Sequence, residues 1–365
     1  MNFPFNVYLL ALAGAFLTSC ASLPLWRAWC RRVGHVDDPG HRKIHSEPVP
    51  LAGGLAVVTG LFVPILVGTL IIVVLGSSKG GNTDEVFFHV PKSLETHSSS
   101  GHTDFILSVQ IDPFGGSGSV TLPLLHYGLG RRAFQLAAIL VGALGMVVLG
   151  WIDDKHELRP AVKFGGQLLI AGLVAASGVR ITLFVPSVVF SYAITILWIL
   201  TLINALNFMD NMNGLCTGLG AIAAWFFALS SGIQGQYLVT LLALLTCGAL
   251  LGFLPYNFPK ASAFLGDAGS HLVGYMLAVL AILPHFYSPE NRHALAVLSP
   301  LLILAVPLGD LVWVVLLRTK LRQPFWIGDT NHLSHRLVRR GWSKPEAVML
   351  IWLLGAVGGA LTLLL

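Results

Sequence analysis

Charged residues are scarce in this sequence. Asp, Glu, Lys and Arg make up 11% of its 365 residues and hydrophobic residues make up 55%, whereas roughly 25% of a typical soluble domain is charged. Such a chain has too little polar surface to form a water-soluble globule. Lipid is the solvent that fits this composition, and helices satisfy their own backbone hydrogen bonds inside lipid. We therefore expect an all-α membrane helix bundle.

Cysteine is also rare, and the spacing of the four cysteines matches neither a disulfide framework nor a metal-binding motif. No Lys or Arg precedes the first apolar segment, which argues against a cleaved signal peptide, because such a peptide needs a basic start. A basic cluster from Arg27 to Lys43 follows that segment instead. Because basic loops favour the cytoplasmic side, the N-terminus is expected outside.

Uncharged stretches long enough to cross about 30 Å of hydrocarbon recur along the chain. We predict a single domain over residues 1–365 with ten membrane-spanning helices, at 5–25, 52–75, 132–151, 162–179, 187–206, 214–231, 237–255, 270–286, 294–317 and 346–365. Both termini then lie outside, and residues 76–131 form an extended outer loop. In this topology 16 of the 22 Lys and Arg residues fall in the inner loops, as the positive-inside rule requires.

Polar clusters gather in the predicted inner loops, so that one membrane face carries the reactive groups. The first of these loops combines a tight Pro and Gly turn with the cations Arg42 and Lys43 and with His45. This combination suits an anionic phosphate. A basic loop that only binds lipid headgroups is the alternative.

The third predicted helix ends in two adjacent carboxylates, Asp153 and Asp154. At the depth of the lipid headgroups this pair is unfavourable unless it holds a cation or a proton. Mg²⁺ is a suitable cation, because it prefers carboxylate oxygens and completes its shell with substrate phosphates. Lys163, at the foot of the next helix, either neutralises a phosphate or pairs with these acids.

The fifth predicted helix ends in a polar ridge. Its members recur every three residues and are Asn204, Asn207, Asp210 and Asn213. If the helix continues, each member lies beside the next. Hydrogen bonding between helices explains such a ridge, but four amide or carboxyl groups followed by Gly214 favour an edge that binds a nucleotide or a metal ion.

The loop after the seventh predicted helix contains Asn257, Phe264 and the sequence Gly266-Asp267. Glycine permits close approach of the backbone to a ligand, and amides at a helix start bind anions. A diphosphate and metal site would use this arrangement. As the alternative, Asp267 only caps the following helix.

The ninth loop carries His332, His335 and Arg336. The two histidines can face one partner on a helix, and the loop suits either phosphate binding or an interfacial basic helix. Asp310 lies inside the ninth predicted helix, where a carboxylate is a functional candidate. Pairing with Arg318 is its structural alternative.

Taken together and in this order, the clusters resemble the polyprenyl-phosphate N-acetylhexosamine-1-phosphate transferase family. That family includes the enzymes that start teichoic acid and enterobacterial common antigen synthesis and, more distantly, phospho-N-acetylmuramoyl-pentapeptide transferase. The resemblance covers residues 37–341. It implies transfer of a sugar 1-phosphate, foremost GlcNAc-1-phosphate, from a UDP-N-acetylhexosamine to undecaprenyl or another polyprenyl phosphate, with release of UMP.

The resemblance also implies a setting and partners. The enzyme is expected in the bacterial inner membrane, with its active site facing the cytoplasm, where it initiates a cell-envelope glycan. Mg²⁺ is the expected cofactor, with Mn²⁺ as an alternative. Nucleic acid is not an expected partner, and formation of a homodimer is left open.

Residue roles follow from the same resemblance. Asp153 and Asp154 are expected to handle the polyprenyl phosphate, one of them as its base, and Asp267, together with Asp154, is expected to hold the metal ion. The expected substrate-binding residues are Asp210 and Asn213 at the nucleotide, Phe264 on uracil, Asn257 and Lys163 at the diphosphate, His332, His335 and Arg336 at the sugar or phosphate, and Arg42, Lys43, His45, Asn204 and Asn207.

Two positions depart from the family pattern. Asn213 stands where the family usually has Asp, and Ser334 stands where it usually has His. These departures motivate one alternative, a catalytically degenerate scaffold. A membrane transporter is the other alternative, although transporters usually collect polar groups near the membrane midplane rather than at one face.

Overall fold

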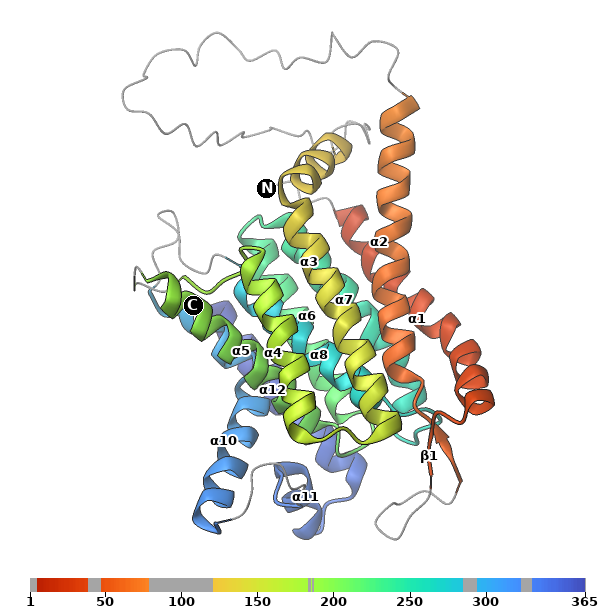
Figure 1. Cartoon of the computed structure of the whole chain (residues 1–365), viewed down its shortest axis with the longest axis vertical. Helices are drawn as coiled ribbons and strands as arrows, with labels where there is room; N and C mark the ends of the chain where they lie inside the picture. Colours follow the sequence, from red (N-terminus) through yellow and green to blue (C-terminus); the bar gives the residue numbers. More distant parts are fainter. Residues whose placement is uncertain are drawn as a thin grey trace.

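The computed structural model describes residues 5–38, 47–78, 121–182, 185, 187–284, 294–322 and 330–364, and these residues form a helical bundle (Figure 1). Its long helices are α1 (Phe5–Val33), α2 (Gly53–Ser78), α3 (Thr121–His156), α4 (Pro160–Ala176), α5 (Val188–Met209), α6 (Leu215–Ile233), α7 (Tyr237–Asn257), α8 (Gly266–Ile282), α10 (Ala305–Lys320) and α12 (Lys344–Leu361). Between α1 and α2 in the sequence, β1 (Val36–Asp37) pairs antiparallel with β2 (Val49–Pro50), so that Val36 lies opposite Pro50.

The predicted polytopic helical membrane fold is confirmed. Within the described residues, seven helices are long and apolar enough to cross a membrane, and these are α1, α2, α3, α5, α6, α7 and α12. The helices α4 and α8 are apolar but shorter. Each of the ten predicted segments is therefore helical, while the number of crossings and the side on which each terminus lies stay predictions.

The ninth predicted segment, 294–317, is not one straight helix. It consists of the short elements η2 (Ala294–Leu298) and α9 (Ser299–Ile303), followed by α10 at an angle of 68°. Pro307 accounts for the break near Leu304, because proline offers no N–H to the carbonyl of Ile303 and its ring crowds that carbonyl. After the bend, α10 extends toward the end of the bundle where α11 (Leu333–Arg339) lies (Figure 1).

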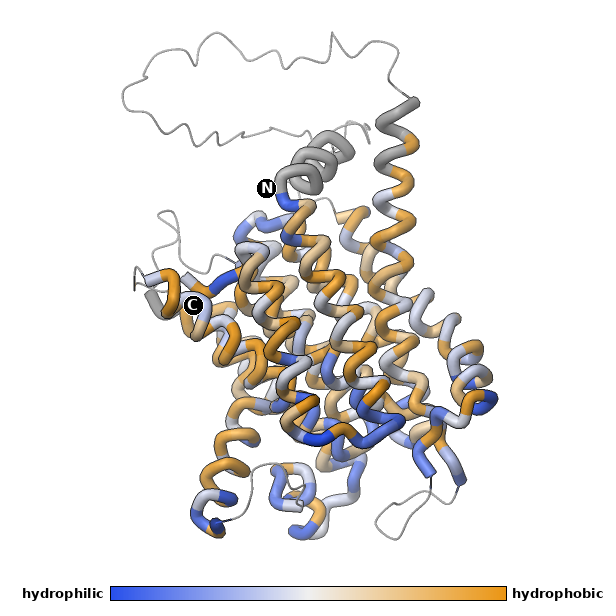
Figure 2. The backbone as a smooth tube through the Cα atoms, in the orientation of Figure 1, coloured by the Kyte–Doolittle hydropathy of each residue, from blue (hydrophilic) through white to orange (hydrophobic). Residues whose placement is uncertain are grey.

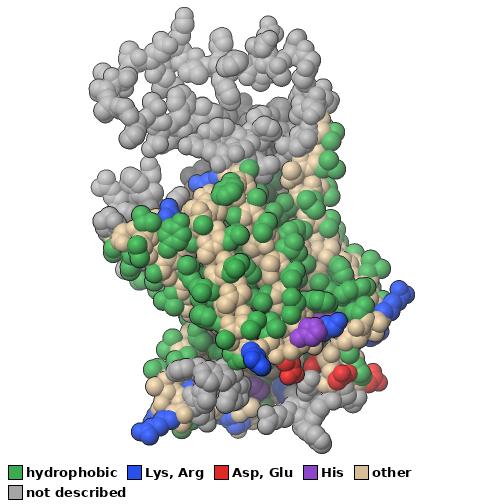
Figure 3. All heavy atoms as spheres, viewed as in Figure 1, with side chains coloured by type: hydrophobic (Ala, Val, Ile, Leu, Met, Phe, Trp, Pro, Cys, Tyr) green, Lys and Arg blue, Asp and Glu red, His purple; other side chains and the backbone are tan. Residues whose placement is uncertain are grey.

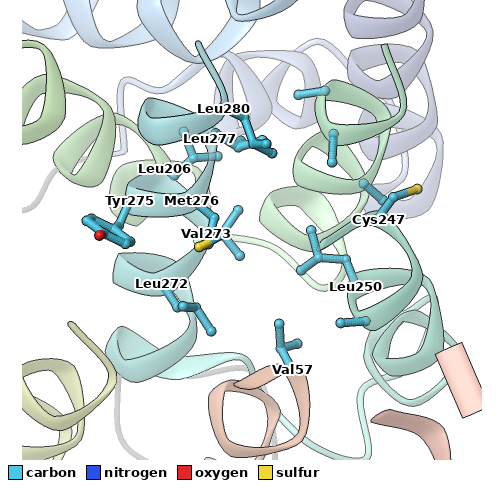
Figure 4. Close-up of a cluster of buried hydrophobic side chains, with 14 of the residues drawn as sticks. Val57, Leu206, Cys247, Leu250, Leu272, Val273, Tyr275, Met276, Leu277 and Leu280 are labelled. Atoms are coloured by element: carbon cyan, nitrogen blue, oxygen red, sulfur yellow. The ribbon is translucent and has the colours of Figure 1, made fainter. Parts of the chain in front are cut away.

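Helix α8 forms the centre of the bundle. Its side chains are buried from Ala268 to Ala281, and it packs against α2, α3, α5 and α6. Figure 4 shows part of this core, with Leu272, Val273 and Met276 of α8 among buried side chains of neighbouring helices. A Cβ atom added at Gly274 would lie 2.6 Å from Cα of Ile203, so this glycine permits the close packing of α5 on α8.

The outer surface divides into an apolar belt and a polar end. Outward-facing side chains such as Leu10 on α1 and Leu66 on α2 are 72% and 63% exposed, which suits contact with lipid rather than water. Figure 2 shows hydrophilic residues concentrated at the end of the bundle that carries α11 (Leu333–Arg339) and β1. On the face drawn in Figure 3, the acidic side chains lie below the hydrophobic belt at this same end.

Candidate active site

Lys163 joins three helices at the polar end. Its Nζ lies 2.7 Å from Oδ2 of Asp153 at the end of α3 and 2.8 Å from Oδ2 of Asp267 at the start of α8. Asn207 of α5 donates to the other oxygen of Asp267 at 2.7 Å and to Oγ of Ser270 at 2.9 Å. Lys163 therefore pairs with one member of the predicted acidic couple and with a third acid that is 104 residues away in the sequence.

The neighbouring carboxylate, Asp154, caps α8. Its Oδ1 accepts a hydrogen bond from the backbone N–H of Asp267 at 2.7 Å, and its Oδ2 accepts one from Ala268 at 3.1 Å. A carboxylate is favourable there because the first N–H groups of a helix lack partners and carry partial positive charge. The alternative in which Asp267 caps its own helix is wrong, because Asp267 lies inside the first turn and donates its N–H.

Two glycines permit this contact between α3 and α8. A side chain at Gly150 would overlap the backbone of Asp267 and Ala268. Gly266 has a φ of +71°, a conformation that favours glycine, and a Cβ atom there would lie 2.8 Å from Oδ2 of Asp154. The end of α3 and the start of α8 can therefore approach closely enough for the cap to form.

The polar ridge of α5 is shorter than predicted. Asn204 donates to Gln167 of α4 at 2.9 Å, and Asn207 reaches Asp267, but the helix ends at Met209 with Asp210 as its C-cap. The chain then turns, and Asn213 donates to the backbone oxygen of Pro259 at 3.2 Å. Asn213 therefore does not continue the ridge, because Gly214, in a left-handed conformation, starts a new helix.

Asn257 joins three segments around the site. It is 2% exposed, and its Oδ1 accepts hydrogen bonds from the Gly214 N–H at 2.9 Å and from Oγ1 of Thr217 at 3.0 Å. Its Nδ2 donates to the backbone oxygen of Ala263 at 3.1 Å. All polar atoms of this amide are thus used to hold α6, α7 and the loop before α8 together.

A cavity of about 1050 Å³ opens beside these groups. Its lining includes the acidic side chains Asp154, Asp210 and Asp267 and the basic side chains His335, Lys260 and Lys344. Phe264 and Asn213 also line it. The cavity is at the upper end of the size range of small-molecule sites, and its polar lining suits an extended, charged ligand.

Negative charge is unfavourable on one carboxyl group of the cavity, Asp210. Burial, and then the charges of Asp267 and Asp154, raise the pKa of Asp210 well above its usual range. A bound cation in this part of the cavity would stabilise the ionised forms of these acids. The acidic wall is therefore suited to a divalent cation or to a cationic group of a ligand.

A short helix, α11, closes the cavity from another side. His335 lines the cavity, whereas His332 is buried and its Nδ1 lies 2.6 Å from Oδ2 of Asp310. The guanidinium of Arg336 lies over the ring of Trp313, 4.5 Å from its centroid. The two histidines therefore do not face one partner, since His332 points into the bundle toward α10.

Burial lowers the pKa of His335, and the positive charges of His332, Arg339 and Lys344 lower it further, against the opposing charge of Asp310. Its imidazole is therefore more readily neutral than a solvated histidine. A neutral imidazole at the cavity wall can both donate and accept a hydrogen bond.

The predicted residues thus fall into four groups. The structure brings seven of them to one network or to the cavity wall beside it: Asp153, Asp154, Lys163, Asn207, Asp210, Asp267 and His335. Phe264, Asn213 and Asn257 also lie at the cavity, while Asn204, His332 and Arg336 make the contacts given above. Arg42, Lys43 and His45 lie outside the described residues, and the functional roles of all these residues stay predictions.

Sequence reasoning missed His271. This residue lies four positions after Asp267, on the same face of α8, and it forms a group with Asp153 and Asp267 in which one potential ligand atom from each residue lies within 4.8 Å of the others. The available signal was a histidine one helical turn after Asp267 in a mostly apolar helix.

The fold and the site define a multi-pass membrane protein with a large polar cavity at one end of its helix bundle. Because transporters usually place their sites near the midplane, this arrangement indicates an enzyme that acts at a bilayer surface. Residues 136–285 match the family model described as glycosyl transferase family 4.

Curated relatives extend this match to nearly the whole chain. A decaprenyl-phosphate N-acetylglucosaminephosphotransferase of Mycobacterium tuberculosis is 30% identical over 371 residues, which cover 94% of this chain and 79% of the relative. A probable undecaprenyl-phosphate N-acetylglucosaminyl 1-phosphate transferase of Bacillus subtilis is 28% identical, with 94% and 80% covered. A phospho-N-acetylmuramoyl-pentapeptide-transferase of Geobacillus kaustophilus is 32% identical, with 62% and 72% covered. The chain belongs to this family of sugar-1-phosphate transferases, as the resemblance predicted.

Proposed function

We propose that this protein transfers an N-acetylhexosamine 1-phosphate, foremost GlcNAc-1-phosphate, from a UDP-sugar to a polyprenyl phosphate. The observation that carries the proposal is the network of Asp153, Lys163 and Asp267 at the wall of a cavity of about 1050 Å³. The names of the relatives supply the substrate class, and the position of the cavity at the end of an apolar bundle suits a donor from water and an acceptor from lipid.

The reaction exchanges one phosphorus–oxygen bond for another. An oxygen of the polyprenyl phosphate attacks the β-phosphorus, which carries the sugar, and the bond from that phosphorus to the bridging oxygen breaks. UMP leaves with the electron pair of that bond. Phosphoryl transfer of this kind depends mainly on alignment and charge neutralisation, which are the tasks that we assign to the residues around the cavity.

The residues present fit a divalent cation. Asp153 and Asp267 offer oxygen ligands, which Mg²⁺ prefers, and the Lys163 ammonium already lies between them. We propose Asp267 as the main ligand, with Mg²⁺ as the ion and Mn²⁺ as an alternative. When bound, the ion neutralises charge on the diphosphate.

The side chains have separate tasks in this proposal. Asp153 orients Lys163, whose ammonium contributes positive charge to the diphosphate, and Asp154 holds the start of α8 so that Asp267 faces the cavity. Phe264 stacks on the uracil ring, and Asp210 and Asn213 bind the nucleotide. His335 contacts the sugar or its phosphate.

The setting follows from the same proposal. We propose a bacterial inner-membrane enzyme whose cavity faces the cytoplasm, where UDP-sugars are made, and which initiates a cell-envelope glycan. The expected orientation rests on the excess of basic residues in the loops at the cavity end. A homodimer stays a prediction, to be checked by the mass of the detergent-solubilised protein.

The test is a transfer assay with purified protein, a polyprenyl phosphate, Mg²⁺ and a panel of UDP-sugars. We expect UMP and a lipid-linked sugar diphosphate to appear in equal amounts, fastest with UDP-GlcNAc, and Asp267→Ala to abolish both. Failure of every UDP-sugar to release UMP, with a folded protein in the membrane, would contradict the proposal. Trapping a phosphorylated Asp153 or Asp154 would contradict direct attack by the lipid phosphate.

A further inference from the structure

His271 is a fully buried imidazole near the start of α8. It is 0% exposed, and within the described part of the chain neither of its ring nitrogens has a hydrogen-bond partner. An unsatisfied buried polar group is unfavourable, so most such groups in proteins have a partner. Packing alone does not explain an imidazole at this position, because a leucine could fill the same apolar space.

The acids of the transfer site lie beside this imidazole. A ring nitrogen of His271, an oxygen of Asp153 and an oxygen of Asp267 all lie within 4.8 Å of one another. Bonds to one divalent ion are about 2.1 Å long, so side-chain movements of under about an ångström would bring the three atoms onto a common ion. Two carboxylates and one imidazole are a donor set that binds divalent transition metals.

We propose that Asp153, Asp267 and His271 form a binding site for a divalent transition-metal ion, with Mn²⁺ as the probe, in which His271 supplies a nitrogen ligand. Imidazole suits transition metals such as Zn²⁺, Fe²⁺ and Ni²⁺, whereas Mg²⁺ prefers oxygen ligands and retains its water. Mn²⁺ serves as the probe because it binds carboxylates and is paramagnetic. His271 therefore shifts the preference of the site away from Mg²⁺. The inference rests on the proposed function only in that both place a cation at Asp267.

Lys163 competes with the ion in this arrangement. Its ammonium lies 2.7 Å from Asp153 and 2.8 Å from Asp267, so it uses the carboxylate oxygens that a metal ion needs. The lysine stem is flexible, and a metal ion that displaces the ammonium leaves it available for an anionic group in the cavity. Removal of the lysine charge should therefore strengthen metal binding, while removal of the imidazole should weaken it.

The decisive measurement uses the wild-type protein and needs no turnover. Chelator-treated, purified full-length protein is titrated with Mn²⁺, and pulsed electron paramagnetic resonance detects any nitrogen nucleus coupled to the bound ion. We expect a histidine nitrogen signal. Absence of stoichiometric Mn²⁺ binding, or bound Mn²⁺ without a nitrogen signal, would overturn the inference and would leave the transfer reaction with Mg²⁺ untouched.

Variants then assign the nitrogen and test the competition. His271→Ala should abolish the nitrogen signal and weaken Mn²⁺ binding by at least about tenfold, since even indirect partners of a metal contribute about that much, while Mg²⁺ affinity changes little. Lys163→Met should tighten Mn²⁺ binding.

Tyr275→Phe, one turn farther along α8, is the matched control. It removes a hydroxyl that donates to the backbone oxygen of Ile139, and it should bind Mn²⁺ as the wild type does. A nitrogen signal that persists in His271→Ala would overturn the assignment.

Discussion

Asp310 and His332, separated by 22 residues, join α10 to α11 through a contact of 2.6 Å between Oδ2 and Nδ1. The second oxygen of Asp310 accepts the backbone N–H of Leu333 at 2.7 Å, so one buried carboxylate holds both the first residues of α11 and their neighbouring imidazole. His335, on this seven-residue helix, lines the cavity. Asp310 thus holds the cavity wall in place without itself touching the cavity.

The first prediction concerns Asp310. Asp310→Ala removes two hydrogen bonds, and we expect a loss of about 2–4 kcal/mol in stability and a higher KM for the UDP-sugar, because His335 loses its fixed position. Asp310→Asn should recover part of both, since an amide can accept from Leu333 and donate to His332. Thermal unfolding and steady-state kinetics measure these effects, and an unchanged KM in Asp310→Ala would contradict the positioning role.

The second prediction separates the adjacent acids of α3. Asp154→Ala should lower stability by about 0.5–2 kcal/mol, as expected for the loss of a helix cap, and should lower kcat because the start of α8 frays and Asp267 moves. Asp154→Asn retains one acceptor and should lie between the wild type and the alanine variant in both measurements.

Asp153 should behave differently, because its Oδ2 pairs with Lys163 rather than with a helix end. Asp153→Asn retains an acceptor for the Leu158 N–H, which now donates to Oδ1 at 2.8 Å, so its effect should fall mainly on kcat. Equal losses of stability in the two asparagine variants would contradict this division of tasks.

Much of this arrangement could be anticipated from the residues themselves. Lipid requires long apolar helices, so the helical segments are visible as uncharged runs, and the acids and amides that end them must lie near a membrane surface. The pairing of Lys163 with an acid and the gathering of Asp267, Asp210 and His335 at one cavity follow from that rule. Local sequence was therefore sufficient for the helices and for the end of the bundle that holds the site.

The specific partners could not be anticipated, because they depend on contacts between distant helices. The close approach of Gly150 to the backbone of Asp267 decides that Asp154, and not Asp267, caps α8. The chain turns at Gly214 instead of continuing α5, so Asn213 lies beside Pro259. The bend before α10 places Asp310 beside His332, a contact that spacing along one helix could not reveal.

The third prediction concerns pH. The pKa of His335 is lowered in the folded protein, so the unfolded chain binds a proton at this residue more readily than the folded chain. Neutral His335 therefore contributes its full stabilisation above the unfolded pKa of about 6.5. That stability is lost as pH falls through the lower, folded pKa. We expect wild-type stability to fall more steeply than that of His335→Gln between about pH 7 and about pH 5. Parallel unfolding temperatures across this range would contradict the assignment.

The fourth prediction concerns nucleotide recognition by Phe264, whose side chain lines the cavity. Its backbone is held independently, since its N–H donates to Pro50 at 3.0 Å and its carbonyl accepts from Gly53 at 2.9 Å, so a change of side chain should leave the loop in place. Stacking of an aromatic ring on a base contributes about 1–3 kcal/mol, so Phe264→Leu should raise the KM for the UDP-sugar by about tenfold or more.

The control for this variant lies in the second substrate. The KM for the polyprenyl phosphate should stay near the wild-type value, because the lipid offers no base to stack on, and Phe264→Tyr should retain tight binding of the UDP-sugar. Inhibition by UMP provides a separate measure, since it reports the uridine contact without the sugar or the lipid. If Phe264→Leu raised both KM values equally while UMP inhibition stayed unchanged, the ring would be supporting the cavity wall, and the uracil would have to be bound elsewhere.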